Sequence, residues 1–261
     1  MLKVRVIPVL LLKNDGLVKG QQFKNHKYVG DPINVVKIFN DKEADEIILL
    51  DITATQQRKE LNFSLLEKVT TEAFMPFAYG GGIRDLSTAK KLFTLGVEKV
   101  VLGTAALENT QLIRELADAF GSQSVVVSVD VKKKLFGSYQ LLGYSGTKSF
   151  KPDLLKYIDL IQSHGVGEIM LNSVDRDGTQ KGLDIELISL VSKHASVPII
   201  ACGGAWTLGH IGEAVTAGAD AVAAGSMFVY EGKHKAVLIT YPKYSALKAL
   251  FENPVGMKID V

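Results

Sequence analysis

Short apolar runs alternate with longer amphipathic segments along the chain. The runs are rich in Val, Ile and Leu, which is typical of strands buried on both faces of a parallel sheet. Several of them lead into glycines or polar turns. The pattern predicts eight strands, at residues 3–12, 46–52, 76–79, 99–102, 124–131, 168–172, 198–201 and 221–224.

The segments between these strands carry apolar residues at helical spacing. Asp31-Pro32 opens the first helix with a capping residue and a proline at the first helical position. Residues 17–30 are polar without a clear period, and we expect a long functional loop there. A small hairpin is predicted at residues 135–143. The later helices are predicted at residues 61–73, 86–95, 110–119, 152–163, 185–194, 209–217 and 245–252.

Strand and helix alternate eight times without a linker between the halves. This order predicts an α/β protein, a (β/α)8 TIM barrel, whose usual length of ~250 residues suits a chain of 261. We expect a single barrel domain over residues 1–261, built from two similar half-barrels at about 1–122 and 123–261. A doubly wound open sheet is the alternative, which the absence of a GxGxxG fingerprint disfavours.

The two halves of the chain match each other at a constant offset. Pro76-Phe-Ala-Tyr-Gly-Gly resembles Pro198-Ile-Ile-Ala-Cys-Gly, and Val100-Val-Leu-Gly-Thr resembles Val222-Ala-Ala-Gly-Ser. The offset is 122 residues in both pairs, and again between Glu46 and Glu168. Equal offsets at three places indicate a duplicated half-barrel.

Turns that contain glycine follow four of the predicted strands. Gly81-Gly82 and Gly203-Gly204 follow the third and seventh, while Gly103-Thr104 and Gly225-Ser226 follow the fourth and eighth. Glycine lets backbone N–H groups approach an anion, and the Thr or Ser hydroxyl that follows it adds a hydrogen-bond donor. The loops after the last two strands are the usual phosphate site of this fold. Tight turns are the structural alternative for one pair, but two matched pairs favour a ligand with a phosphate at each end.

Composition narrows the classes of partner. The net charge is +2 and the hydrophobic content is 47%, so no basic field suggests nucleic acid. Cys202 is the single cysteine and no Cys/His ligand spacing occurs, so we expect no disulfide, metal or cofactor and a reducing, cytoplasmic setting. Met1–Lys3 lead directly into a strand without a signal-peptide design, and no apolar run reaches the ~18 residues of a membrane helix.

Asp130 lies at the C-terminal end of the fifth predicted strand, where α/β barrels place their chemistry. An isolated aspartate at such a position often serves as a turn former or helix cap, but its place between two candidate phosphate sites favours a catalytic role.

Several segments resemble one known family along nearly the whole chain, the cyclase subunit of imidazole glycerol phosphate synthase, or HisF type, of histidine biosynthesis. The isomerase of the same pathway, also a duplicated two-phosphate barrel, is a poorer match at Asp175-Arg-Asp-Gly-Thr179. The segments that carry the resemblance are Asp51-Ile-Thr-Ala, Gly80-Gly-Gly-Ile, Thr104-Ala-Ala, Phe120-Gly-Ser-Gln, Val125-Val-Val-Ser-Val-Asp130, Tyr144-Ser-Gly, Ser173-Val-Asp-Arg-Asp-Gly-Thr179 and Cys202-Gly-Gly-Ala205.

The resemblance implies a partner and a gate. A HisH-type glutaminase would release ammonia, which would enter at the bottom of the barrel and react at the top with a small phosphorylated substrate. The family guards the entrance with charged residues near strand starts. A salt-bridge plug through which no ammonia passes is the structural alternative, although buried charges are costly unless they are paired. The matching positions here are Arg5, Glu46, Lys99 and Glu168.

The resemblance also assigns substrate contacts. Lys19 matches a lysine that helps to close the family's first loop over substrate, and an ordinary surface lysine is the alternative. Gly103 stands where the family usually has Asn, which is an imperfect match. The substrate- and phosphate-binding positions carried over are Lys19, Asp51, Gly82, Gly103, Thr104, Asp177, Gly178, Gly204, Gly225 and Ser226.

One departure from the family bears directly on the reaction. The family's cyclase uses two aspartates as general acid and base; Asp130 matches the second, and the first falls on Leu11. Loss of a positioned general acid or base typically costs ~10²–10⁴-fold in rate. Three hypotheses remain. The first is a HisF-like paralogue that uses ammonia to turn the acetamido group of a surface-sugar nucleotide into an amidine. The second is an altered imidazole glycerol phosphate synthase subunit, and the third is a non-catalytic barrel that regulates a glutaminase.

Overall fold

The computed structural model describes residues 4–232 and 234–252. The predictions for Met1–Lys3, including the start of the first strand, therefore lie outside the described residues, as do Lys233 and residues 253–261 of the predicted tail. The predicted helix at 245–252 is present as α11 (Tyr244–Glu252).

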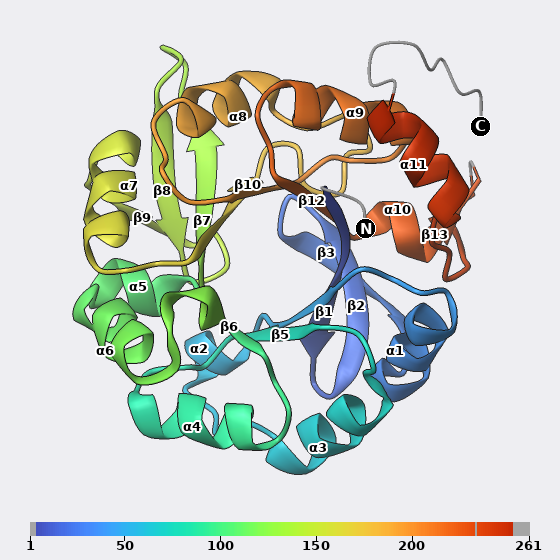
Figure 1. The fold of residues 1–261 in the computed structure, drawn as a ribbon, viewed down its shortest axis with the longest axis horizontal. Coiled ribbons are helices and arrows are strands. Elements are labelled where there is room, and N and C mark those ends of the chain that lie inside the picture. The colour runs from blue at the N-terminus through green and yellow to red at the C-terminus, as the bar shows by residue number, and fades with distance from the viewer. Residues whose placement is uncertain (1–3, 233, 253–261) are drawn as a thin grey trace.

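Eight parallel strands close into a barrel, which confirms the predicted fold (Figure 1). Each strand pairs with its neighbour in chain order, and the ring closes because the last strand pairs with the first. The doubly wound alternative is therefore excluded. The barrel strands are β1 (Arg5–Lys13), β4 (Ile47–Asp51), β5 (Phe77–Gly80), β6 (Lys99–Leu102), β7 (Val125–Lys133), β10 (Glu168–Ser173), β11 (Ile199–Cys202) and β12 (Ala221–Ala224).

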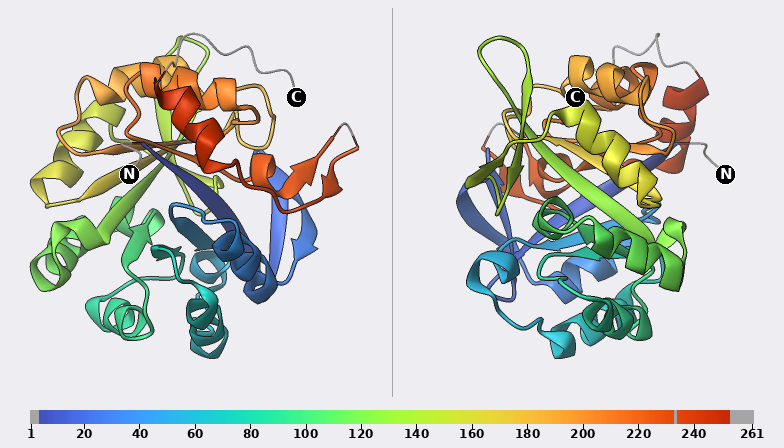
Figure 2. Two further views of the ribbon diagram at one scale, coloured as in Figure 1. Left: turned by 45° about the vertical axis from the view of Figure 1, so that its right-hand side comes forward. Right: turned by 90° about the vertical axis from the view of Figure 1, so that its left-hand side faces the viewer.

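Helices surround the barrel as an outer layer (Figures 1 and 2). Their starts follow from the sequence, because aspartate caps α1, α4, α7 and α8 through its side chain. No helix among the described residues is long and apolar enough to cross a membrane. The helices are α1 (Pro32–Asp41), α2 (Ala54–Gln57), α3 (Phe63–Glu72), α4 (Leu86–Thr94), α5 (Thr104–Glu108), α6 (Gln111–Phe120), α7 (Leu154–Ser163), α8 (Ile185–Ser192), α9 (Leu208–Thr216), α10 (Ser226–Val229) and α11, with a 3-10 turn η1 (Ser122–Ser124).

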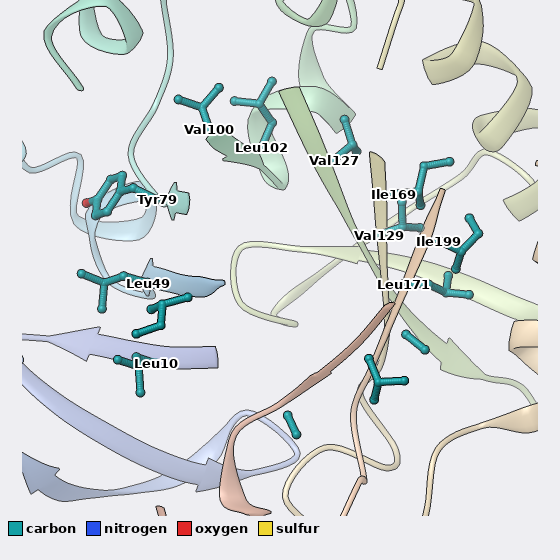
Figure 3. Close-up of a cluster of buried hydrophobic side chains, with 14 of the residues drawn as sticks. Leu10, Leu49, Tyr79, Val100, Leu102, Val127, Val129, Ile169, Leu171 and Ile199 are labelled. Carbon is teal, nitrogen blue, oxygen red and sulfur yellow. The ribbon is translucent and has the colours of Figure 1, made fainter. Parts of the chain in front are cut away.

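Alternate residues of the barrel strands point into two apolar layers, one under the helices and one inside the barrel. On β1, Val6 and Leu10 point outward into the layer under the helices, whereas Ile7 and Val9 join the filling of the barrel. Figure 3 shows part of the outer layer, with Leu10 among the labelled side chains. Because both faces of each strand are buried, the sequence shows continuous apolar runs rather than alternation. The barrel filling consists of Ile7, Val9, Ile48, Ala78, Val101, Val126, Met170, Ile200, Ala221 and Ala223.

The segment 17–30 is not the irregular loop that the sequence predicts. It forms a β-hairpin of β2 (Gly16–Gln21) and β3 (Lys24–Gly30), and β2 pairs back onto β1. Gln22 and Phe23 make the turn with positive φ values of 50° and 62°. The strands were missed because β3 is mostly exposed and polar, so no apolar alternation marks it.

The hairpin predicted at 135–143 is present but begins earlier. β7 continues to Lys133 and pairs with β8 (Tyr139–Gly143), which in turn pairs with β9 (Lys148–Phe150). This hairpin extends beyond the helical layer (Figure 2). A further small hairpin, β13 (Tyr230–Glu231) with β14 (Ala236–Val237), precedes α11.

Strand register repeats between the halves of the barrel. Leu49 of β4 lies opposite Tyr79 of β5, and Leu171 of β10, 122 residues later, lies opposite Ala201 of β11. The glycines that follow also match, since φ is +100° at Gly81 and +94° at its counterpart Gly203. The repeat seen in the sequence is therefore a repeat of local geometry.

Candidate active site at the barrel mouth

A cavity opens at the C-terminal ends of the barrel strands. Its wall includes Leu11 and Lys19 from the first strand and hairpin, and Asp130 and Asn172 from the opposite side. The hairpin covers part of it, because Gln22 donates its backbone N–H to Asp177 O at 2.9 Å and its side chain to Asp175 O at 2.9 Å. The structure thus brings most of the predicted substrate-binding residues to one site.

Asp130 ends the inward-facing row of β7 at this cavity. Asn172 Nδ2 donates to Asp130 Oδ1 at 3.0 Å, and Ser128 Oγ lies 3.5 Å from the same oxygen. Burial raises the pKa of the carboxyl to about 6, and the hydrogen bond from Asn172 partly offsets this rise. A carboxyl that titrates near neutrality can both accept and donate a proton at physiological pH.

Leu11 occupies the position opposite Asp130. β1 and β7 stand four strands apart in the eight-stranded ring. Leu11 pairs with Leu50 of β4 just as Asp130 pairs with Asn172 of β10, and Leu50 and Asn172 are 122 residues apart. All four side chains line the cavity. One side of the mouth therefore carries an aspartate–asparagine pair and the other side two leucines.

The loops after β11 and β12 form one candidate anion site. Gly204 (φ +104°) and Gly225 line the cavity with Ser226, which begins α10. A Cβ on Gly204 would stand 2.2 Å from Gly182 O, so the close backbone approach requires glycine. Gly178 lines the same side, and the backbone of the β2–β3 hairpin packs against it.

The loops after β5 and β6 form the matching site across the mouth. Gly81, Gly103 and Thr104 line the cavity, and Thr104 Oγ1 accepts from Tyr144 N at 2.8 Å. Gly82 differs from the prediction, because its N–H donates to Thr55 Oγ1 at 3.2 Å and it lines a separate outer cleft. At this position Gly81, and not the predicted Gly82, lines the mouth.

Asp51 shapes a loop as well as lining the cavity. Its Oδ1 accepts from Thr53 N and Thr53 Oγ1 at 2.8 Å each and from Ala54 N at 2.9 Å. These bonds fix the turn that leads from β4 into α2. One carboxylate oxygen is committed to this turn, and the predicted substrate contact would fall to Oδ2.

Lys19 is buried rather than on the surface. It is 6% exposed, and its Nζ donates to Val9 O at 2.8 Å. A Cβ on Gly225 would lie 1.7 Å from Nζ, so the ammonium rests on the glycine of the candidate anion site after β12. Burial lowers the pKa of Lys19, and the Asp177 carboxylate works in the opposite direction. Burial raises the pKa of the Asp177 carboxyl, and the nearby charge of Lys19 partly offsets this rise.

Four charged side chains form a ring at the opposite end of the barrel. Arg5 bonds to Glu46 and, at 3.0 Å, to Glu168, while Lys99 Nζ lies 3.0 Å from Glu46 and 3.2 Å from Glu168. Burial of Arg5 disfavours its charged form, but the two carboxylates outweigh this and raise its pKa. Each cation touches both anions, so the ring closes the barrel floor with its charges paired.

Asn172 was not predicted from the sequence as a site residue. It is 7% exposed at the end of β10, beside Asp130 and next to Cys202 of β11. The available signal was an amide at the end of a buried strand, at the repeat position of Leu50. Cys202 lines the same wall, and burial raises the pKa of its thiol to about 12, which keeps it protonated.

A (β/α)8 barrel with Asp130 in a cavity at the C-terminal ends of its strands has its candidate site where barrel enzymes place their chemistry. A family model described as "Histidine biosynthesis protein" matches residues 5–235. The chain therefore belongs to this family, and its relatives place it with the HisF-type subunits.

Three relatives illustrate the similarity. A Pseudomonas aeruginosa protein provisionally named imidazole glycerol phosphate synthase subunit hisF2 is 51% identical over 95% of this chain and 99% of its own length. A Leptospira borgpetersenii protein provisionally named subunit HisF is 47% identical over 96% of this chain and 100% of its own. Streptomyces coelicolor imidazole glycerol phosphate synthase subunit HisF is 41% identical over 87% of this chain and 90% of its own.

Proposed function

We propose that this chain is the synthase subunit of a glutamine amidotransferase and that it uses ammonia to convert the acetamido group of a sugar nucleotide into an amidine. The product would serve the synthesis of a surface polysaccharide. The observation that carries the proposal is the asymmetry of the mouth, with Asp130 and Asn172 facing Leu11 and Leu50.

Imidazole ring closure in the family needs two carboxylates that work as acid and base on opposite sides of the substrate. Leu11 cannot transfer a proton, and it occupies the position from which the family's first aspartate would act. Amidination needs no ring closure. The ammonia nitrogen attacks the acetamido carbon, protons pass from nitrogen to the carbonyl oxygen, and that oxygen leaves as water. One group with a pKa of about 6, Asp130, suffices for these transfers.

The substrate would be held through its phosphates. The phosphates of a sugar nucleotide are adjacent and would occupy one of the two candidate anion sites, and Lys19 adds a buried ammonium beside Gly225 at the site after β12. An apolar surface at Leu11 suits the methyl group of an acetamido substituent better than the polar chain of a ribulosyl nucleotide. This fit supports a sugar nucleotide as the phosphorylated substrate.

The ammonia would come from a HisH-type glutaminase bound at the floor of the barrel. The ring of Arg5, Glu46, Lys99 and Glu168 lies at that end, and the apolar filling of the barrel leads from it to the mouth. A purely structural plug would not need charges, because an apolar floor would be as stable. The ring therefore supports a gate for a small polar molecule.

Synthesis of imidazole glycerol phosphate is the second candidate, since the relatives carry that name and the anion loops match it. Leu11 in place of the family's aspartate is what favours the first candidate over the second. A non-catalytic role is disfavoured by the perturbed pKa of Asp130 inside the cavity.

Complementation of a histidine auxotroph that lacks its cyclase subunit tests the choice. We expect the unmodified chain to fail and Leu11→Asp to restore growth. Leu11→Asn, which is polar but cannot take up a proton, is the matched control and should fail. Growth with the unmodified chain would contradict the amidination proposal in favour of the second candidate.

A further inference from the structure

The side-chain amide of Asn172 is only half engaged. Its Nδ2 donates to Asp130 Oδ1 at 3.0 Å. Its Oδ1 is sealed from solvent and accepts from no donor within residues 4–232 and 234–252. Buried carbonyl oxygens almost always have a donor, because an unsatisfied one loses its hydration without compensation. The free oxygen therefore points to a ligand that brings an N–H or O–H group.

This oxygen lies at the wall of the mouth. A Cβ on Gly203 would stand 2.8 Å from Asn172 Oδ1, and both residues line the cavity. The neighbours along the wall are Asp130 on one side and Cys202 on the other. Because Oδ1 is covered, a ligand meets it when the Asn172 amide turns toward the cavity, where the ligand would touch the carboxylate of Asp130 as well.

The approach from below favours a very small ligand. The barrel filling beneath the mouth is entirely apolar, and its members on the same strands are Val126 and Met170. Above it, Ser128 is 8% exposed and precedes Asp130 by two residues on the inward face of β7. A neutral molecule that rises through the barrel meets its first hydrogen-bond acceptors at Ser128, Asp130 and Asn172.

We propose that Asn172 and Asp130 form the ammonia site of this enzyme. Asn172 Oδ1 accepts one N–H of ammonia. This hydrogen bond orients the lone pair of the ammonia nitrogen toward the acceptor carbon. The C–N bond forms as the carbonyl electron pair moves to oxygen. Asp130 then carries two protons in turn from nitrogen to that oxygen, which leaves as water while the C=N bond forms. This assignment rests on the proposed ammonia-dependent function and adds a positioning residue to it.

Two variants separate the acceptor from the donor of the amide. Asn172→Leu keeps the size of the side chain and removes both groups, whereas Asn172→Asp keeps an oxygen acceptor and removes the donor. Asn34→Leu, at an exposed position on α1, is the control for the substitution itself.

The first readout needs no acceptor substrate. Protein with carbon-13 aspartate and nitrogen-15 asparagine is titrated with ammonium chloride at pH 9, with potassium chloride as the salt control. Asp130 signals are assigned from Asp130→Asn. We expect the Asp130 carboxyl and Asn172 amide resonances to move with ammonium chloride only, and the Asp130 movement to disappear in Asn172→Leu. Equal responses to both salts in the unmodified protein would overturn the site.

The second readout is steady-state kinetics with whichever phosphorylated acceptor is turned over. Loss of one hydrogen bond should raise KM for ammonia about fivefold in Asn172→Leu and leave the acceptor KM unchanged. Asn172→Asp should retain the ammonia KM but move the acidic limb of the pH profile upward, because a second carboxylate raises the pKa of Asp130. An unchanged ammonia KM in Asn172→Leu would contradict the proposal.

The two readouts distinguish the two proposals. If neither the acetamido sugar nucleotide nor the ribulosyl nucleotide is turned over while the resonances respond to ammonia, the proposed substrate is wrong and the ammonia site stands. If turnover occurs without any response of Asn172, the function stands and the ammonia site is wrong.

Discussion

Neutralising Glu46 should destabilise the protein far more than neutralising an exposed glutamate. The Glu46 side chain is 2% exposed and lies between two cations, with Lys99 Nζ 3.0 and 3.1 Å from its two oxygens and Arg5 on the other side. In Glu46→Gln, Arg5 and Lys99 would share only Glu168, at 3.0 and 3.2 Å.

The magnitude follows from this geometry. Removal of one partner from a fully buried ion pair costs about 3–5 kcal/mol, because the other charge stays buried without compensation. Glu168 still contacts both cations here, and Arg5 is partly exposed. We therefore expect the lower end of that range, a loss of about 3 kcal/mol in the free energy of unfolding.

Urea denaturation followed by circular dichroism measures the loss, since guanidinium salts would screen the charges. The matched control is Glu252→Gln, which breaks the exposed pair of Glu252 with Lys248 and should cost about 0.5 kcal/mol or less. If Glu46→Gln lost no more free energy of unfolding than Glu252→Gln, the ring would stabilise the protein no more than an exposed ion pair does. That result would refute the reasoning.

Three further predictions concern the mouth. The pKa of Asp130 is raised from 3.8 to about 6, so its contribution to stability is full at low pH and is lost as pH rises from about 4 through 6. Asp130→Asn should therefore raise the free energy of unfolding at pH 8 by about 3 kcal/mol, and equal stability at pH 8 would count against this reasoning. The same variant should abolish turnover, because asparagine cannot transfer a proton. Because burial lowers the pKa of Lys19, Lys19→Met should stabilise the protein at neutral pH, by thermal unfolding, while raising KM for the phosphorylated acceptor; an unchanged KM would remove Lys19 from the site. Ser226→Ala should weaken inorganic phosphate binding about fivefold by calorimetry with little effect on stability, and unchanged binding would argue against an anion site there.

The barrel could be predicted from the sequence because both faces of every strand are buried. Runs such as Val125–Val129 leave no exposed face, and the aspartate caps at Asp31 and Asp153 mark helix starts locally. The hairpin of residues 17–30 could not be predicted in this way. Its second strand is solvent-exposed, and its turn uses left-handed Gln22 and Phe23 rather than glycine.

The site was predictable where a residue type has few roles at its position. The charges at strand starts and the matched glycines are of this kind, and the structure brings the four charges into contact. Asn172 was missed because its role depends on a neighbour, Asp130, that is 42 residues away in sequence. Gly82 was misplaced because the direction of a backbone N–H within a Gly-Gly loop depends on the fold.

The direct test of the central claim is a comparison of two acceptors. The purified chain is supplied with ammonium chloride and either an acetamido sugar nucleotide or the ribulosyl nucleotide of the histidine pathway. Products are followed by mass spectrometry. We expect exchange of one oxygen for an NH group on the sugar nucleotide, loss of that exchange in Asp130→Asn, and imidazole formation only in Leu11→Asp. Imidazole formation by the unmodified chain, without change to the sugar nucleotide, would contradict the account.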